Sequence, residues 1–131
     1  MSRQQRNFTF ERLPMKSLIA LVFAMSMMVP VAAHASWGVI AVDDQVGEKD
    51  PAYGVGGGDS KAKATQNAMK FCKEASGTKC DVAVTYEKCG AYASSRKYSG
   101  TGTASTVQEA KKKALSDCNN ANCRVLIADC N

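Results

Sequence analysis

The chain has 131 residues, with 17 lysines and arginines against 12 aspartates and glutamates, a formal net charge of +5. Its basic excess is concentrated at the N-terminus, because residues 1–35 hold four of the basic residues and one acid, so residues 36–131 carry 13 basic and 11 acidic residues. That balance excludes the strongly basic footprint of a nucleic-acid-binding protein, and the length suits one domain with a modest core.

The N-terminal 35 residues have the order of a secretory signal peptide. Lys16 precedes an apolar run over residues 18–28, and the small-residue triplet Ala33-His34-Ala35 follows. This order of charge, apolar run and A-x-A predicts cleavage after Ala35. Because the run is shorter than the roughly 18 to 20 residues of a spanning helix, we expect no membrane span after cleavage.

Removal of the leader leaves residues 36–131 as a single domain, which we expect in the periplasm or outside the cell. Residues 1–14 precede the apparent signal and are compatible either with an extended leader or with a start codon placed too early.

The first part of this domain is predicted to run strand, strand, helix, strand. Strand-forming residues occupy 37–42, a short strand is expected over 53–56, and another over 82–86. Between them, Asp59 or Ser60 is placed to cap a helix. Its apolar stripe recurs at three- and four-residue steps and consists of Ala64, Ala68, Phe71 and Cys72.

The second part repeats this order. Strands are expected over 91–95, 98–102 and 125–128. Thr106 and Glu109 have the spacing of a capping box, which predicts a helix start. The helix that follows has a matching stripe of Val107, Ala110, Ala114 and Cys118.

The two parts form an internal repeat. Aligning Cys72 with Cys118 places the alanines of one expected helix on those of the other, and CDVAVTYEKC then corresponds to CRVLIADC. The halves are about 37–89 and 90–131. We therefore predict an α+β domain of two layers, an antiparallel sheet with two helices on one face, built from a duplicated strand-strand-helix-strand unit.

An even number of cysteines in a short exported chain indicates disulfides. All six lie in the mature region, and spacing alone cannot choose among their 15 pairings. The repeat favours three pairs: Cys72–Cys80, Cys118–Cys123 and Cys89–Cys130. The first two would join a helix end to the next strand, and the third would clip the halves together.

The glycine-rich stretch YGVGGGDSKA, residues 53–62, raises the question of a phosphate site. It lacks G-x-G-x-x-G, because Asp59 takes the place of the last glycine, and it lacks the Gly-Lys-Ser/Thr of a P-loop. Asp59 would also repel a phosphate at the helix start. We therefore predict a strand-to-helix turn with no ligand.

The mature region has no histidine, since His34 falls inside the leader. Histidine-based catalysis and zinc sites are thereby excluded, and paired cysteines would exclude thiolates. We expect no cofactor and no metal. An enzyme would have to use a Ser–Lys pair or the loop carboxylates Asp43, Asp44, Glu48 and Asp50.

Surface chemistry suggests binding instead. Tyrosines and a tryptophan are too many for one small sheet to bury, so some are expected on its open face near Arg96 and Lys97. The second helix would present Lys111 and Lys112 to an acidic partner or an anionic polymer. The candidate partner-binding residues are Trp37, Asp43, Asp44, Tyr53, Tyr86, Tyr92, Arg96, Lys97, Tyr98, Lys111 and Lys112.

With these residues assembled, the chain resembles the exported bacterial domain of unknown function 4189 family. The resemblance rests on SWGVIAVDD, YGVGGGDSKAKATQNAMKFC, CDVAVTYEKCGAYA, STVQEAKKKALSDC and CRVLIADCN. Membership implies no agreed activity. Small exported domains of this kind could serve as immunity proteins against secreted toxins.

We therefore expect a non-catalytic binding module, an inhibitor or immunity-type protein whose partner is a toxin or an envelope enzyme. The alternatives are an envelope-acting hydrolase that uses the loop carboxylates and a binder of anionic envelope polymers.

Overall fold

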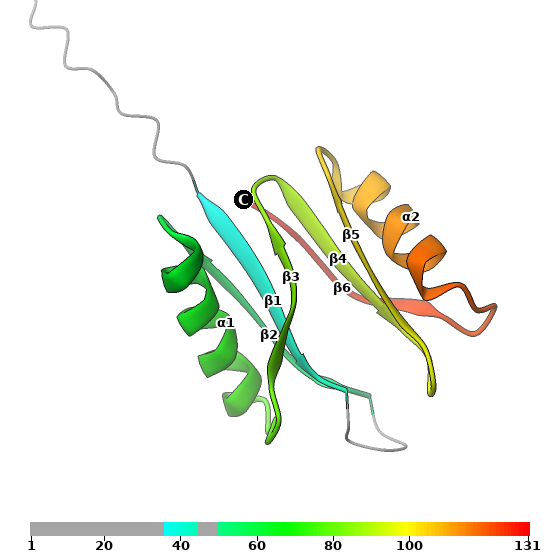
Figure 1. The fold of residues 1–131 in the computed structure, drawn as a ribbon, viewed down its shortest axis with the longest axis horizontal. Coiled ribbons are helices and arrows are strands. Elements are labelled where there is room, and N and C mark those ends of the chain that lie inside the picture. The colour runs from blue at the N-terminus through cyan, green and yellow to red at the C-terminus, as the bar shows by residue number, and fades with distance from the viewer. Residues whose placement is uncertain (1–35, 45–49) are drawn as a thin grey trace, which may run out of the picture. The chain divides into compact units, whose positions relative to one another are not determined.

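The described residues form two successive units of strand, strand, helix and strand, as the sequence predicts (Figure 1). The structure is a computed structural model that describes residues 36–44 and 50–131, so the expected leader and Glu48 lie outside the described residues. The elements are β1 (Trp37–Asp43), β2 (Ala52–Gly58), α1 (Lys61–Glu74), β3 (Asp81–Tyr86), β4 (Cys89–Ser94), β5 (Ser99–Ala104), α2 (Val107–Cys118) and β6 (Arg124–Cys130).

Each unit folds into its own antiparallel three-stranded sheet. The strand orders are β2-β1-β3 and β5-β4-β6, so the first strand of each unit is central in both. The registers also correspond, because Val39 lies opposite Gly56 in one sheet and Ala91 opposite Gly102 in the other. The α+β class is confirmed, and the two units have the same topology.

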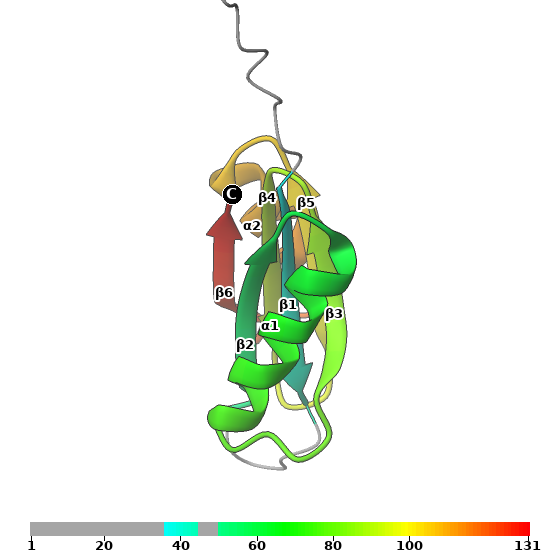
Figure 2. The same ribbon diagram turned by 90° about the vertical axis from the view of Figure 1, so that its left-hand side faces the viewer.

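The layering differs from the expected single sheet with both helices on one face. The two sheets pack face to face, and α1 and α2 cover their outer faces (Figures 1 and 2). Strand β1 shows the reason: Val39 and Ala41 pack with α1, whereas Ile40 and Val42 join the core between the sheets. A strand that is apolar on both sides needs a cover on both sides.

Glycines on the strands and alanines on the helices allow each helix to lie close to its sheet. A Cβ atom on Gly56 would stand 2.2 Å from the backbone nitrogen of Ala68 and 2.4 Å from the carbonyl oxygen of Ala64. One on Gly100 would stand 2.1 Å from the nitrogen of Cys118. The strand expected over 53–56 is present and extends to Gly58, so the turn to α1 is limited to Asp59 and Ser60. Gly54, Gly56 and Gly58 allow the close contact with α1.

The helix starts are capped as the sequence predicts. The Ser60 hydroxyl accepts from the backbone N–H of Lys63 at 3.2 Å, and the Thr106 hydroxyl accepts from that of Glu109 at 3.3 Å. In the described ranges, neither helix has the length and apolar character needed to cross a membrane.

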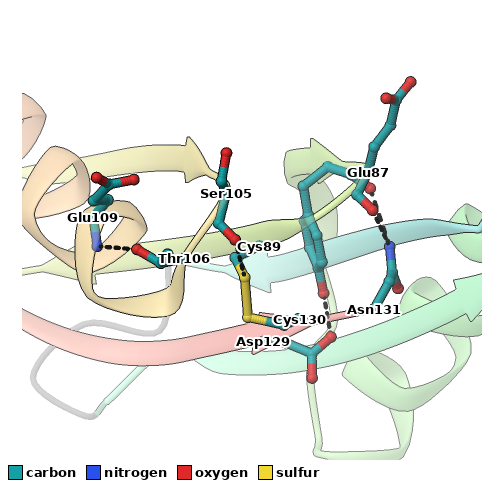
Figure 3. The surroundings of a disulfide bond; sticks show 9 residues. Glu87, Cys89, Ser105, Thr106, Glu109, Asp129, Cys130 and Asn131 are labelled. Carbon is teal, nitrogen blue, oxygen red and sulfur yellow. Dashed lines mark hydrogen bonds between the residues drawn. A yellow bond between two sulfur atoms is a disulfide. The ribbon is translucent and has the colours of Figure 1, made fainter.

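The three disulfides have the pairing that the repeat favours, and the described residues contain no free cysteine. Two of them join the end of a helix to the start of the next strand. The third has a different role from the one expected, because Cys89 on β4 lies opposite Cys130 on β6 (Figure 3). It therefore closes the second sheet and does not clip the halves together.

The halves are held together by the apolar layer between the sheets and by contacts near the C-terminus. The chain passes from β3 to β4 through Glu87 and Lys88. Asn131 braces this crossover: its backbone N–H donates to the carbonyl of Lys88 at 2.9 Å, and its side-chain amide donates to that of Glu87 at 3.2 Å (Figure 3).

We predict that Gly56→Ala lowers the free energy of unfolding by about 3 kcal/mol, because the added methyl forces α1 away from its sheet. Urea unfolding measures the change. Gly57→Ala is the matched control, since the nearest atom to its Cβ, the carbonyl oxygen of Trp37, would be 3.8 Å away. Equal stability of the two variants would show that helix contact does not require the glycine.

Candidate functional site

The described strands do not form the open aromatic sheet face that the sequence predicts. Tyr86 and Tyr92 are each 2% exposed, because they lie in the layer between the two sheets. Each sheet covers the face that the other would have left open. These two residues therefore do not form an aromatic binding surface.

Tyr86 is instead a polar link between the halves. Its hydroxyl donates to the Asp129 carboxylate at 2.6 Å, from β3 across to β6. Its ring fills space beside Gly38 and Gly90, where a Cβ atom would stand 2.2 Å from ring carbons. Burial raises the pKa of Tyr86 far above its usual value, and the hydrogen bond and charge of Asp129 raise it further.

Asp43 also has a structural position. Its side chain is buried, and one carboxylate oxygen accepts from the backbone N–H groups of Thr78 at 2.8 Å and Lys79 at 2.9 Å. These bonds fasten the loop between α1 and β3 to the end of β1. The expectation that Asp43 contacts a partner is therefore replaced by a role in the fold.

Other candidates lie on separate surfaces. Trp37 is half-buried with the Lys61 ammonium 4.4 Å above its ring, and Tyr53 is 40% exposed on β2. Lys111 and Lys112 are on α2, the first half-buried and the second exposed. These residues do not line the cleft described next.

A cleft of about 830 Å³ opens where three loops meet at one end of the two sheets. The segment leading into β2 contributes Asp44, Asp50 and Pro51. The end of β4 and the β4–β5 turn contribute residues 94–99, together with Tyr92. The loop after α2 and the start of β6 contribute Asn120, Asn122, Arg124 and Leu126. Its volume is within the range of ligand-binding sites.

The rim of the cleft carries both signs of charge. Arg96 and Lys97 stand at the tip of the β4–β5 turn, where Ser95 and Tyr98 close the hairpin through a backbone bond of 2.8 Å. Arg124 forms an ion pair with Asp50, which connects the second unit to the loop of the first. All of these charged groups are exposed, so each can reorient toward a partner.

Tyr92 lies at the floor of the cleft. Its hydroxyl is buried, and none of its neighbours among the described residues, the Ser94 and Ser99 hydroxyls included, is placed with hydrogen-bond geometry. Burial raises the pKa of Tyr92; the hydroxyls of Ser99 and Ser94 oppose the rise, and the charge of Asp44 adds to it. The phenol therefore stays protonated at neutral pH and can donate a hydrogen bond.

Sequence reasoning found one side of this cleft and missed the other. It singled out Asp44, Tyr92, Arg96, Lys97 and Tyr98, which the fold brings together. It missed the asparagines of CNNANC and the arginine that follows, because that segment was interpreted as a disulfide loop and a strand. A short loop rich in asparagine between two elements was the available signal.

The site offers hydrogen-bonding and charged groups for recognition. The described residues contain no group of three or more His, Cys, Asp or Glu side chains placed to hold a metal ion. All six cysteines are bonded in pairs, so none is available as a thiolate.

Fold and site together define a small, disulfide-bonded α+β domain with a polar cleft. The chain belongs to the family described as "Domain of unknown function (DUF4189)", whose model matches residues 37–130. No curated protein matches the chain. The NMR structure of Rv1813c from Mycobacterium tuberculosis is similar, with a TM-score of 0.55 and 19% identity over 100% of this chain and 98% of that one. At this identity the likeness establishes the fold alone.

We predict that the stability of the protein falls as pH rises above about 10, because the Tyr86 phenol ionises in the unfolded chain and stays protonated in the folded one. Tyr86→Phe removes the part of the pH dependence that comes from ionisation of Tyr86. Its deficit at pH 8, about 2 kcal/mol from the lost hydrogen bond to the Asp129 carboxylate, should shrink by about 1.4 kcal/mol per pH unit above 10. Urea unfolding of both proteins from pH 8 to 11 measures the gap, and parallel curves would contradict the assignment.

Proposed function

We propose that this domain is an exported, non-catalytic protein-binding module that blocks a toxin or an envelope enzyme, as an inhibitor or immunity-type protein does. It engages its partner with the end of the domain where the cleft opens. The observation that carries the proposal is the convergence of three loops from both halves around one polar cleft with an exposed, charged rim.

The chemistry of the rim supports recognition of a protein. Tyr98 is 53% exposed next to Arg96 and Lys97, and arginine and tyrosine are enriched among residues that dominate binding energy at interfaces. The two cations favour acidic groups at the edge of the partner's surface. Their turn is held by a bond from the Ser95 N–H to the Tyr98 carbonyl and one from the Tyr98 N–H to the Ser95 hydroxyl.

The covalent frame supports a role outside the cytoplasm. Three disulfides in a domain of this size are typical of proteins in oxidising compartments and are consistent with an extracytoplasmic location. Cys118–Cys123 also holds one loop of the cleft in place before binding, because it spans the segment that supplies Asn120 and Asn122. Such preorganisation lowers the entropic cost of association.

The alternative functions have less support. Among the loop carboxylates, Asp43 is bound to backbone amides and Asp50 is paired with Arg124, so neither is poised as a general base. For polymer binding, Lys113 donates to the carbonyl of Thr103 and Lys70 pairs with Glu74, which leaves a less continuous basic surface on the helices.

The test uses the full chain, exported and tagged at its C-terminus, to recover a partner that mass spectrometry identifies and that is then purified. Calorimetry should give a stoichiometry near 1:1, and Arg96→Glu with Lys97→Glu should weaken binding by tenfold or more, because two cations become acids. Lys111→Glu with Lys112→Glu is the matched control with the same charge change on α2, and it should retain binding.

Two outcomes would contradict the proposal. One is repeated failure to recover a stoichiometric partner, including among the products of neighbouring genes. The other is loss of binding in the α2 variant with retention in the turn variant, which would move the interaction to the helix lysines.

A further inference from the structure

The Tyr92 hydroxyl, at the floor of the cleft, is a buried hydrogen-bond donor that lacks an acceptor in the described part of the chain. It is buried and has no hydrogen-bond partner among the described residues, although Ser94 and Ser99 lie near enough to influence it. A buried hydroxyl without a partner costs roughly 1 to 3 kcal/mol, and native proteins keep few of them. Because Tyr92 lines the cleft, a group that enters the cleft can supply the missing acceptor.

The surroundings of this hydroxyl decide what kind of acceptor fits. Asp44 lines the same cleft and is close enough for its charge to act on Tyr92, so a carboxylate or phosphate would be repelled there. A cation would face Arg96, Lys97 and Arg124 on the way in. An apolar group would leave the hydroxyl unpaired.

We infer that the floor of the cleft is a subsite for one uncharged side-chain amide, that of an asparagine or glutamine inserted by the partner protein. The amide oxygen accepts from the Tyr92 hydroxyl, and the amide N–H₂ donates to the Asp44 carboxylate. A single neutral group that both accepts and donates satisfies both residues, which neither an acid nor a cation does. The inference rests on the proposed function, because it names the group that the partner inserts.

Access to the subsite requires movement of the rim. Arg96, Lys97, Tyr98 and Ser99 line the cleft and are all exposed, so their side chains can change rotamer at small cost as a group enters. The charged rim then surrounds a neutral, desolvated contact, which is the arrangement of energetically dominant residues at protein interfaces.

The test uses three blocked tripeptides that differ in one side chain: acetyl-Gly-Gln-Gly-amide, its glutamate analogue and its methionine analogue. The three side chains have nearly the same shape and differ in charge and hydrogen bonding. Each is titrated into the ¹⁵N-labelled exported protein at pH 7, and the backbone amide shifts of residues 92–99 are followed. The glutamine peptide should bind there at least threefold more tightly than either analogue.

Two variants test whether peptide binding depends on a hydrogen bond to Tyr92 or only on the shape of the inserted side chain. Tyr92→Phe should weaken the glutamine peptide about three- to tenfold, the loss expected for one neutral hydrogen bond, and leave the methionine peptide unchanged. Tyr53→Phe is the matched control, since it removes the same hydroxyl from an exposed tyrosine outside the cleft. Unfolding midpoints of both variants check that the fold is intact.

Several results would overturn the inference. Equal or tighter binding of the glutamate peptide would make the floor an anion site, and absence of saturable binding by any peptide at residues 92–99 would remove the subsite. Tighter, Tyr92-dependent binding of tri-N-acetylchitotriose would assign the amide to a glycan. If a purified partner loses affinity with the turn variant but not with Tyr92→Phe, the proposed function stands and this inference fails.

Discussion

The closeness of each helix to its sheet is the constraint from which the rest of the structure follows. Glycine on β2 and alanine on α1 bring backbone against backbone, and the same pairing recurs between β5 and α2. Such contacts pack densely but remove little apolar surface from water, because neither residue has much side chain. The larger residues Ile40, Val84 and Tyr92 are therefore placed on the opposite faces of the sheets, where they form a second core between the halves.

That second core explains both the layering and the site. Two sheets that cover each other bury Tyr86 and Tyr92, so their facing sides are closed to a partner, whereas the loops at the sheet ends remain exposed. Polar interactions also join the two halves. Tyr86 donates a hydrogen bond to Asp129 between the sheets, and Arg124 forms an ion pair with Asp50 at the cleft. The cleft is thus built by both halves, and each supplies part of its lining.

Much of the fold could be predicted from the sequence because its signals are local. The alanine stripes, the cap at Thr106 and the alignment of Cys72 with Cys118 identified the element order, and the alignment also pointed to the disulfide pairing. The arrangement of layers could not be predicted in this way. Whether the side of β1 that faces away from α1 meets water or a second sheet depends on contacts between distant segments. The sequence of a short apolar strand is the same in both cases.

The same limit applied to the candidate site. Arg96, Lys97 and Tyr98 are adjacent in sequence and were recognisable as a group, but Asn120 and Arg124 join them only through the meeting of two loops. Asp43 and Asp44 are neighbours with opposite roles, since strand alternation sends one side chain inward to the Thr78 amide and leaves the other exposed. Both residues are aspartates, so residue type alone does not predict which of them is buried.

The three disulfides supply stability that the glycine–alanine contacts do not, because those contacts bury little apolar surface. In the chain-entropy description each contributes about 2 to 4 kcal/mol, the most for the widest loop, Cys89 to Cys130. The most direct measurement is urea unfolding of the exported protein before and after reduction and alkylation of all six cysteines. We predict that the reduced protein loses most or all of its folded state; an unchanged unfolding midpoint would show that the disulfides are not needed for stability.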